Sequence, residues 1–267
     1  METNVIFALG LTVFAGLSTG IGSTLAFFTR RTDQKFLSLA LGFSAGVMIY
    51  VSMIEIFGKA KDSLVMIWGM KNGCIVTVIS FFLGMLFIAL IDRLIPIYEN
   101  PHEMHEIEEM NNKSRQAGFK RIGFVSALAI AIHNFPEGFA TFASALNDTQ
   151  LGISIAIAIA IHNIPEGIAV SVPLYYATGN RKKAFFWSFL SGLSEPLGAI
   201  VGYLLLSSMF DLERYFGIPF AMVAGIMVFI SFDELLPAAE KYGEHHLAIY
   251  GLLAGMLVMA LSLLLFA

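Results

Sequence analysis

The stretch Ala129-Ile-Ala-Ile-His-Asn-Phe-Pro-Glu-Gly138 returns later in the chain as Ala158-Ile-Ala-Ile-His-Asn-Ile-Pro-Glu-Gly167. Each copy carries a histidine and, four residues later, a glutamate, a spacing that puts both side chains on one face of a helix. Both copies lie inside long apolar runs. The sequence therefore predicts two neighbouring hydrophobic helices that bury the same set of polar, metal-ligating side chains.

The composition around these motifs is that of a membrane protein. Of the 267 residues, 57% are hydrophobic and 13% are charged, and the mean hydropathy is +0.76, whereas a typical soluble domain is about 25% charged. A soluble core cannot bury so much apolar surface, so the lipid bilayer must solvate most of it. A net charge of −4 excludes the usual basic footprint of nucleic-acid binding, and the single Cys74 excludes a disulfide within the chain.

Eight stretches are long enough to cross the hydrocarbon as helices of about 20 residues. They are expected at 4–28, 36–57, 72–91, 121–146, 151–176, 184–208, 217–236 and 246–266. Twelve of the 16 Lys and Arg residues fall in the odd-numbered loops between them. Because Lys and Arg accumulate in cytoplasmic loops, we expect these loops inside the cell and both termini outside it.

Three of these helices recur later in the chain. Residues 45–55 (AGVMIYVSMIE) match 224–234 (AGIMVFISFDE), residues 16–22 (GLSTGIG) match 192–198 (GLSEPLG), and residues 84–90 (GMLFIAL) match 255–261 (GMLVMAL). The shift is an odd number of helices, so the copies are inverted in the membrane. We expect an all-α polytopic membrane protein with one domain, 1–267, in a 3 + 2 + 3 arrangement. Helices 1–3 and 6–8 are inverted repeats around the central pair, a pattern typical of secondary transporters.

The longest polar stretch, 93–120, is expected to be a cytoplasmic loop that is acidic and contains histidine. It carries His102 and His105 among several glutamates. Two interpretations stay open for it, a low-affinity loop that collects cations and a solvated acidic linker.

The polar residues inside the helices form the candidate site. The turn between the two motif helices is expected near Asp148, which places both motifs roughly 20 to 23 Å deep, near the middle of the membrane. Carboxylates at that depth need protons or a metal, and imidazole, carboxylate and amide oxygen suit Zn²⁺, Fe²⁺ or Mn²⁺. The expected metal ligands are His133, Asn134, Glu137, His162, Asn163, Glu166 and, from the sixth helix, Glu195.

Four further residues are candidates for a cation pathway. Met48 could supply a soft ligand, although methionine is more often core filler. Glu55 is expected near the outer end of the second helix, and Asp233 and Glu234 near the inner end of the seventh. The inverted repeat would thus place an acid at each mouth, with interfacial solvation as the alternative explanation.

With these motifs the chain resembles the ZIP family of divalent metal transporters, in its bacterial ZupT-type branch. The two HNxPEG motifs, the Glu195 helix and Asp233-Glu-Leu-Leu-Pro237 carry the resemblance, which extends over nearly the whole chain. It implies a multi-pass protein of the bacterial plasma membrane that takes zinc into the cytoplasm, and often also iron, manganese, cobalt or cadmium. No catalytic cofactor is implied.

The resemblance also implies a two-metal centre with shared ligands. The first metal would use Glu137, His162 and Glu166, with His133 and Met48 nearby. The adjoining metal would be held by Asn134, Glu137, Asn163, Glu166 and Glu195, so that the two motif glutamates bridge the metals.

The residues alone leave three functions open. The first is a carrier whose repeats expose the metal alternately to each side of the membrane. The second is an intramembrane di-metal enzyme, because paired carboxylates and histidines also occur in hydrolytic and oxygen-activating centres. The third is a metal-selective channel with the same lining. The chain has no P-loop signature for nucleotide-driven pumping, and a homodimer is one assembly that the sequence leaves open.

Overall fold

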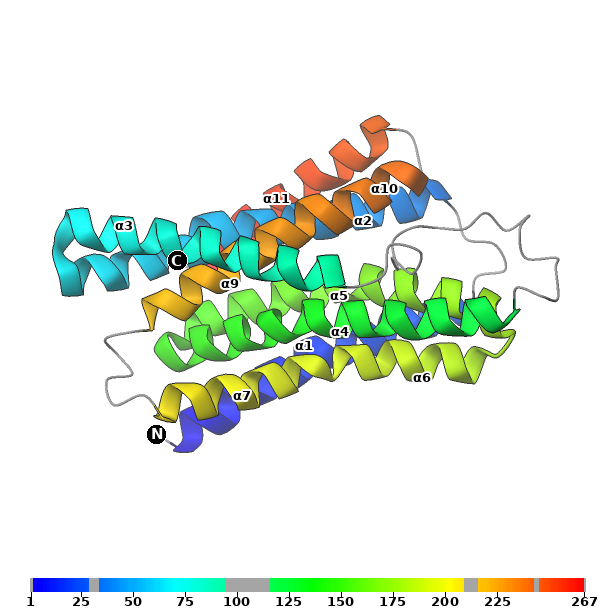
Figure 1. The fold of residues 1–267 in the computed structure, drawn as a ribbon, viewed down its shortest axis with the longest axis horizontal. Helices are drawn as coiled ribbons and strands as arrows, with labels where there is room; N and C mark the ends of the chain where they lie inside the picture. Colours follow the sequence, from blue (N-terminus) through cyan, green and yellow to red (C-terminus); the bar gives the residue numbers. More distant parts are fainter. Residues whose placement is uncertain (1, 29–33, 95–115, 209–215, 243–244, 267) are drawn as a thin grey trace.

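The computed structural model describes residues 2–28, 34–94, 116–208, 216–242 and 245–266, which are helical apart from short turns (Figure 1). The elements are α1 (Glu2–Phe28), α2 (Gln34–Tyr50), the π-helix η1 (Val51–Ile56), α3 (Phe57–Leu94), α4 (Gln116–Asn147), α5 (Thr149–Thr178), α6 (Arg181–Gly192), α7 (Ser194–Ser208), α9 (Gly217–Ile230), the π-helix η5 (Ser231–Leu235), α10 (Leu236–Tyr242) and α11 (His245–Phe266). These ranges contain no strand, as the sequence predicts.

Six stretches of the described chain are long and apolar enough to cross a membrane. One of them, Lys35–Arg93, contains Gly69, whose φ of 75° and ψ of 166° interrupt α3. The chain turns back there, so that α3 is a hairpin of two arms (Figure 1), and Gly73 on one arm packs against the backbone of Val65 on the other. The protein is therefore polytopic.

The first arm of this hairpin extends beyond the predicted helix end. A loop is expected to follow residue 57, but the helix continues as far as the break at Gly69. Ala60 and Leu64 are fully buried one turn apart, and both lie against Gly217 at the start of α9. This added helix is stabilised by tertiary packing, which the hydropathy of the segment does not reveal. The helix expected at 217–236 likewise extends past residue 236, through α10 to Tyr242.

Two π-helices occupy matching positions in the repeated segments. In η1 the N–H of Phe57 bonds to the carbonyl of Ser52, and in η5 the N–H of Leu236 bonds to that of Ser231. Both bonds span five residues, which is the π-helical pattern. Ser52 and Ser231 are aligned by the sequence match, so the two segments share the same local irregularity.

The span expected at 184–208 consists of two helices, α6 and α7. The N–H of Leu193, between them, bonds to the carbonyls of Phe189 and Leu190. Pro196 has no N–H to bond to the carbonyl of Gly192, which explains why the helix is interrupted here. As a result, Glu195 lies in the first turn of α7, where it is completely buried.

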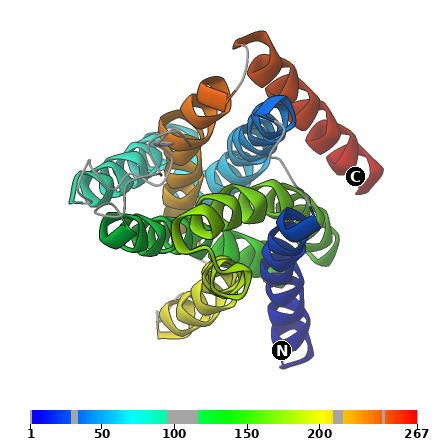
Figure 2. The same ribbon diagram turned by 90° about the vertical axis from the view of Figure 1, so that its right-hand side faces the viewer.

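The two motif helices, α4 and α5, lie at the centre of the bundle (Figure 2). The largest interfaces join α1 to α5 and α7 to α4, and join α2 to α11 and α3 to α9. In addition, α2 contacts α5, and α9 contacts α4. Elements from both repeated segments therefore surround the two helices that carry the motifs.

Glycines allow these helices to approach closely at matching places. A side chain at Gly46 of α2 would overlap the carbonyl oxygen of Leu252 in α11. A side chain at Gly225 of α9 would overlap the carbonyl oxygen of Phe81 in α3. The sequence match aligns Gly46 with Gly225, and small residues at such crossings are the usual basis of helix packing in membranes.

The predicted loop 93–120 lies largely outside the described residues. α3 ends at Leu94 and α4 begins at Gln116, so both ends of the predicted loop are helical. Its histidines and glutamates fall within 95–115, which the structure does not describe.

These close approaches generate a prediction about stability. Gly46→Ala and Gly225→Ala should each destabilise the protein by roughly 1–3 kcal/mol, because the added methyl group overpacks a helix crossing. Gly10→Ala is the matched control, since nothing lies within 4 Å of a side chain at Gly10. Thermal unfolding of the detergent-purified protein measures the effect, and equal midpoints for all three variants would contradict the packing described.

Candidate metal centre

The motif histidines and glutamates meet between α4 and α5. His133 and Glu137 lie one turn apart on α4, and His162 and Glu166 lie one turn apart on α5. All four side chains are buried, none more than 3% exposed. The turn between the helices is where the sequence predicts it, with the carboxylate of Asp148 accepting hydrogen bonds from the first backbone N–H groups of α5. The motifs thus face each other across the interface of two antiparallel helices.

The histidines and glutamates of the two helices are interleaved. Nε2 of His133 lies 3.4 Å from Oε1 of Glu137 on its own helix and 3.2 Å from Oε1 of Glu166 on the other. Nε2 of His162 lies 3.1 Å from Oε1 of Glu137 and 4.0 Å from Oε1 of Glu166. Donor atoms of His133, Glu137 and Glu166 lie within 4.8 Å of one another.

The orientation of His162 makes its Nε2 atom available to a cation. Its Nδ1 atom lies 3.2 Å from the carbonyl oxygen of Ala158, one turn earlier. When Nδ1–H donates to that carbonyl, Nε2 carries the lone pair, as in most metal-binding histidines. That lone pair then faces an oxygen of Glu137, and only a proton or a metal ion between the two atoms makes the pair favourable. In tetrahedral zinc coordination, ligand nitrogen and oxygen atoms are about 3.4 Å apart, close to the separations in this cluster.

Several buried oxygen atoms of the motif residues and of Glu195 have no hydrogen-bond partner in the described part of the chain. Buried polar atoms are normally paired, so such a group indicates a site for a cation or water. The atoms are Oδ1 of Asn134 and Asn163 and Oε2 of Glu137, Glu166 and Glu195. Their residues are the five expected to hold the adjoining metal.

Glu195 is brought to this group by close packing of α7 on α4. Gly138, directly after Glu137, lies against the backbone carbonyl of Glu195, so a larger residue could not fit there. The amide nitrogen of Asn163 donates to Oε1 of Glu195 and to the carbonyl of Ala15 in α1. Asn163 therefore fixes one oxygen of Glu195, while its own Oδ1 atom has no hydrogen-bond partner in the described chain.

α2 contributes a contact to the cluster that the sequence analysis did not single out. The hydroxyl of Ser44 donates to Oε1 of Glu166 over 3.3 Å, and both side chains are buried. Met48 follows one turn later on the same helix and is completely buried, which fits either core packing or a place beside the cluster. A serine in an apolar run carries no sequence signal of such a role.

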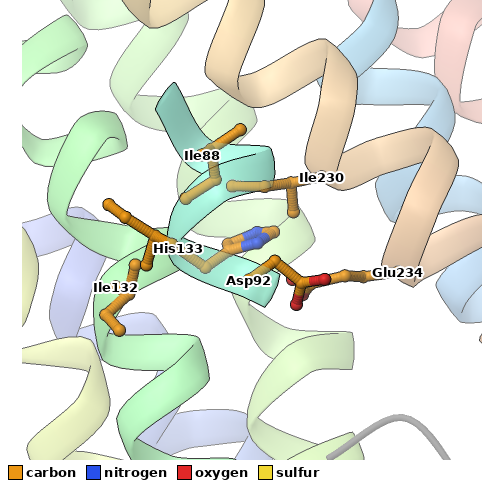
Figure 3. Close-up of a pocket in the computed structure, with 7 residues that line it drawn as sticks. Ile88, Asp92, Ile132, His133, Ile230 and Glu234 are labelled. Carbon is orange, nitrogen blue, oxygen red and sulfur yellow. The ribbon is translucent and has the colours of Figure 1, made fainter. Parts of the chain in front are cut away.

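A pocket joins His133 to one of the predicted mouth acids (Figure 3). Glu234 of η5 lines it, whereas Asp233 is exposed and does not. Asp92, in the last turn of α3, is a second acid in this pocket, and the only sequence signal for it is its place at the end of an apolar run. The complete lining is Ile88, Ile91, Asp92, Ile132, His133, Ile230 and Glu234.

Glu55 lies apart from this pocket, on η1. It is half-buried, and its carboxylate is 3.9 Å from the ammonium of Lys59 one turn later. Of these two predicted mouth acids, Glu234 lines the pocket with His133 and Glu55 does not.

The fold and the site together define a class, a multi-pass helical membrane protein with a buried histidine and carboxylate cluster suited to a divalent cation. The chain belongs to the ZIP family: the model described as "ZIP Zinc transporter" matches residues 98–263.

Curated relatives match along their whole length. A protein named zinc transporter ZupT from Chlorobaculum parvum is 64% identical, with 100% of both chains covered. Its namesake from Clostridium perfringens is 62% identical over 98% of this chain and 97% of its own. A third, from Lysinibacillus sphaericus, is 63% identical over 99% of each chain.

Proposed function

We propose that this protein takes zinc into the cytoplasm across the bacterial plasma membrane. The observation that carries the proposal is the interleaved cluster of His133, Glu137, His162 and Glu166. Three of its four nitrogen-to-oxygen separations are 3.1 to 3.4 Å, which suits a tetrahedral ion, and the fourth is 4.0 Å. The relatives are named as zinc transporters, which supports transport rather than catalysis.

The site is proposed to hold two metal ions. The first is bound by the imidazoles together with Oε1 of Glu137 and Glu166, and the second by the group of unpaired oxygens that includes Glu195. Each bridging glutamate would then use one oxygen for each ion, which fits the pairing of their Oε1 atoms and the free Oε2 atoms. Nitrogen and oxygen donors without thiolate also suit Fe²⁺ and Mn²⁺, so we include these ions as alternative cargo.

Transport is proposed to proceed by alternating access in a bundle of eight helices. The first three and the last three of the predicted membrane-spanning helices would be inverted repeats around α4 and α5. Both termini would lie outside the cell. Three observations support this: the two π-helices at aligned positions, the aligned pair Gly46 and Gly225 at helix crossings, and the equivalent approaches of Gly138 to Glu195 and of Gly167 to Thr19. Glu195 and Thr19 are themselves aligned by the repeat.

Removal of a bridging carboxylate tests the proposed function directly. Glu137→Ala and Glu166→Ala should each abolish saturable zinc uptake into proteoliposomes, because each removes a ligand from both ions and leaves their charge under-neutralised. Asp62→Asn, a change at an exposed acid of the α3 hairpin, is the control and should leave uptake unchanged. Near wild-type uptake by either folded alanine variant would refute the site.

The proposed orientation makes a second prediction. In a Cys74→Ser background, Glu55→Cys should react with a membrane-impermeant thiol reagent in intact cells, because Glu55 is placed at the outward mouth. Glu234→Cys should react only after the cells are opened. The reverse pattern, or equal labelling of both positions, would show that the proposed topology is wrong.

A further inference from the structure

The two motif glutamates are not equivalent, because only one of them is held by a hydroxyl group. Oε1 of Glu166 lies 3.2 Å from Nε2 of His133 and also accepts the 3.3 Å hydrogen bond from Ser44. Among the residues that the structure describes, Oε1 of Glu137 is approached by the two histidine rings alone, at 3.1 and 3.4 Å. The carboxylate of Glu166 thus has a neutral donor that Glu137 lacks.

The repeat explains why this difference arises. When the alignment of residues 45–55 with 224–234 is extended by one residue, Ser44 is aligned with Val223. The side chain of valine has no hydrogen-bond donor. The helix that bears Ser44 is α2, which belongs to the first repeated segment, whereas Glu166 belongs to the central α5. The hydrogen bond therefore joins a helix of the first repeated segment to a motif helix, and the described part of the second repeated segment shows no counterpart to it.

We infer that Ser44 is a positioning residue that orients the carboxylate of Glu166 for zinc. The hydroxyl occupies one lone pair of Oε1 and limits rotation of the carboxylate, so that Oε2 stays directed away from Ser44 and available to a metal. Because Ser44 is 0% exposed and Glu166 is 2% exposed, water does not readily replace the lost donor. The inference rests on the proposed zinc transport and adds a residue to its binding step.

The chemistry gives a specific expectation. A hydrogen bond from a hydroxyl to an ionised carboxylate is charge-assisted, and loss of an outer partner of a metal ligand typically lowers metal affinity or activity about 10- to 100-fold. The 3.3 Å separation is longer than the usual range of about 2.5–3.0 Å for a hydroxyl donor, so we expect a loss of about tenfold, at the lower end of the range for such a loss. Since orientation of a ligand governs capture of the ion, the loss should fall on KM rather than on Vmax.

The test is zinc uptake by proteoliposomes that contain Ser44→Ala, Ser44→Val or Ser44→Thr. Val and Thr have nearly the same shape and differ by the hydroxyl, so this pair separates hydrogen bonding from packing. KM for zinc should rise about tenfold in the Ala and Val variants, with Vmax within about twofold, and should return toward the wild-type value in the Thr variant. Equilibrium zinc affinity in detergent, measured by competition with a fluorescent chelator, should fall by the same factor.

Ser38→Ala is the matched control, because Ser38 is another fully buried serine of α2 and has no hydrogen-bond partner in the described chain. A wild-type KM for Ser44→Ala, a Thr variant as weak as the Val variant, or an equal shift in Ser38→Ala would each overturn the role of Ser44. If the wild-type protein itself took up no zinc, the proposed function would fail, and that result is distinct from a failure of Ser44 alone.

Discussion

Three carboxylates buried between membrane-spanning helices impose the strongest constraint on this protein. An ionised side chain at the centre of a bilayer costs about 3 kcal/mol or more, and Glu137, Glu166 and Glu195 are each at most 2% exposed. The described helices place no lysine or arginine within ion-pair distance of them; the ion-pair partners of Glu137 and Glu166 there are histidines, and Glu195 is held by the amide of Asn163. A divalent cation bound at the proposed site would offset this cost.

The rest of the fold serves to bring these groups together. Histidine and glutamate lie one turn apart on each motif helix, and the antiparallel pairing of α4 and α5 interleaves them. Glycines next to the motif glutamates let α1 and α7 approach to backbone contact, so that Glu195 and the carbonyl of Ala15 reach Asn163. The break between α6 and α7 turns Glu195 into the protein rather than toward lipid.

Much of the site is predictable from the sequence because its signals are local. The i, i+4 spacing of His133 with Glu137 and of His162 with Glu166 fixes their common face, and the length of the turn at Asp148 fixes their common depth. Residues that depend on contacts between distant helices escape this reasoning. Ser44 looks like any small residue in an apolar run, and Asp92 looks like an interfacial acid at a helix end. The π-helices and the added helix before Gly69 depend on tertiary packing, so no single residue type in the sequence predicts them.

The most direct test of the account is X-ray absorption spectroscopy at the zinc edge on the zinc-loaded protein in detergent. We expect a first shell of nitrogen and oxygen at about 2.0–2.1 Å with the scattering pattern of imidazole, and a second zinc at about 3.5–4 Å. A first shell dominated by sulfur, or one with no imidazole contribution, would contradict a centre built from His133, His162 and the bridging glutamates.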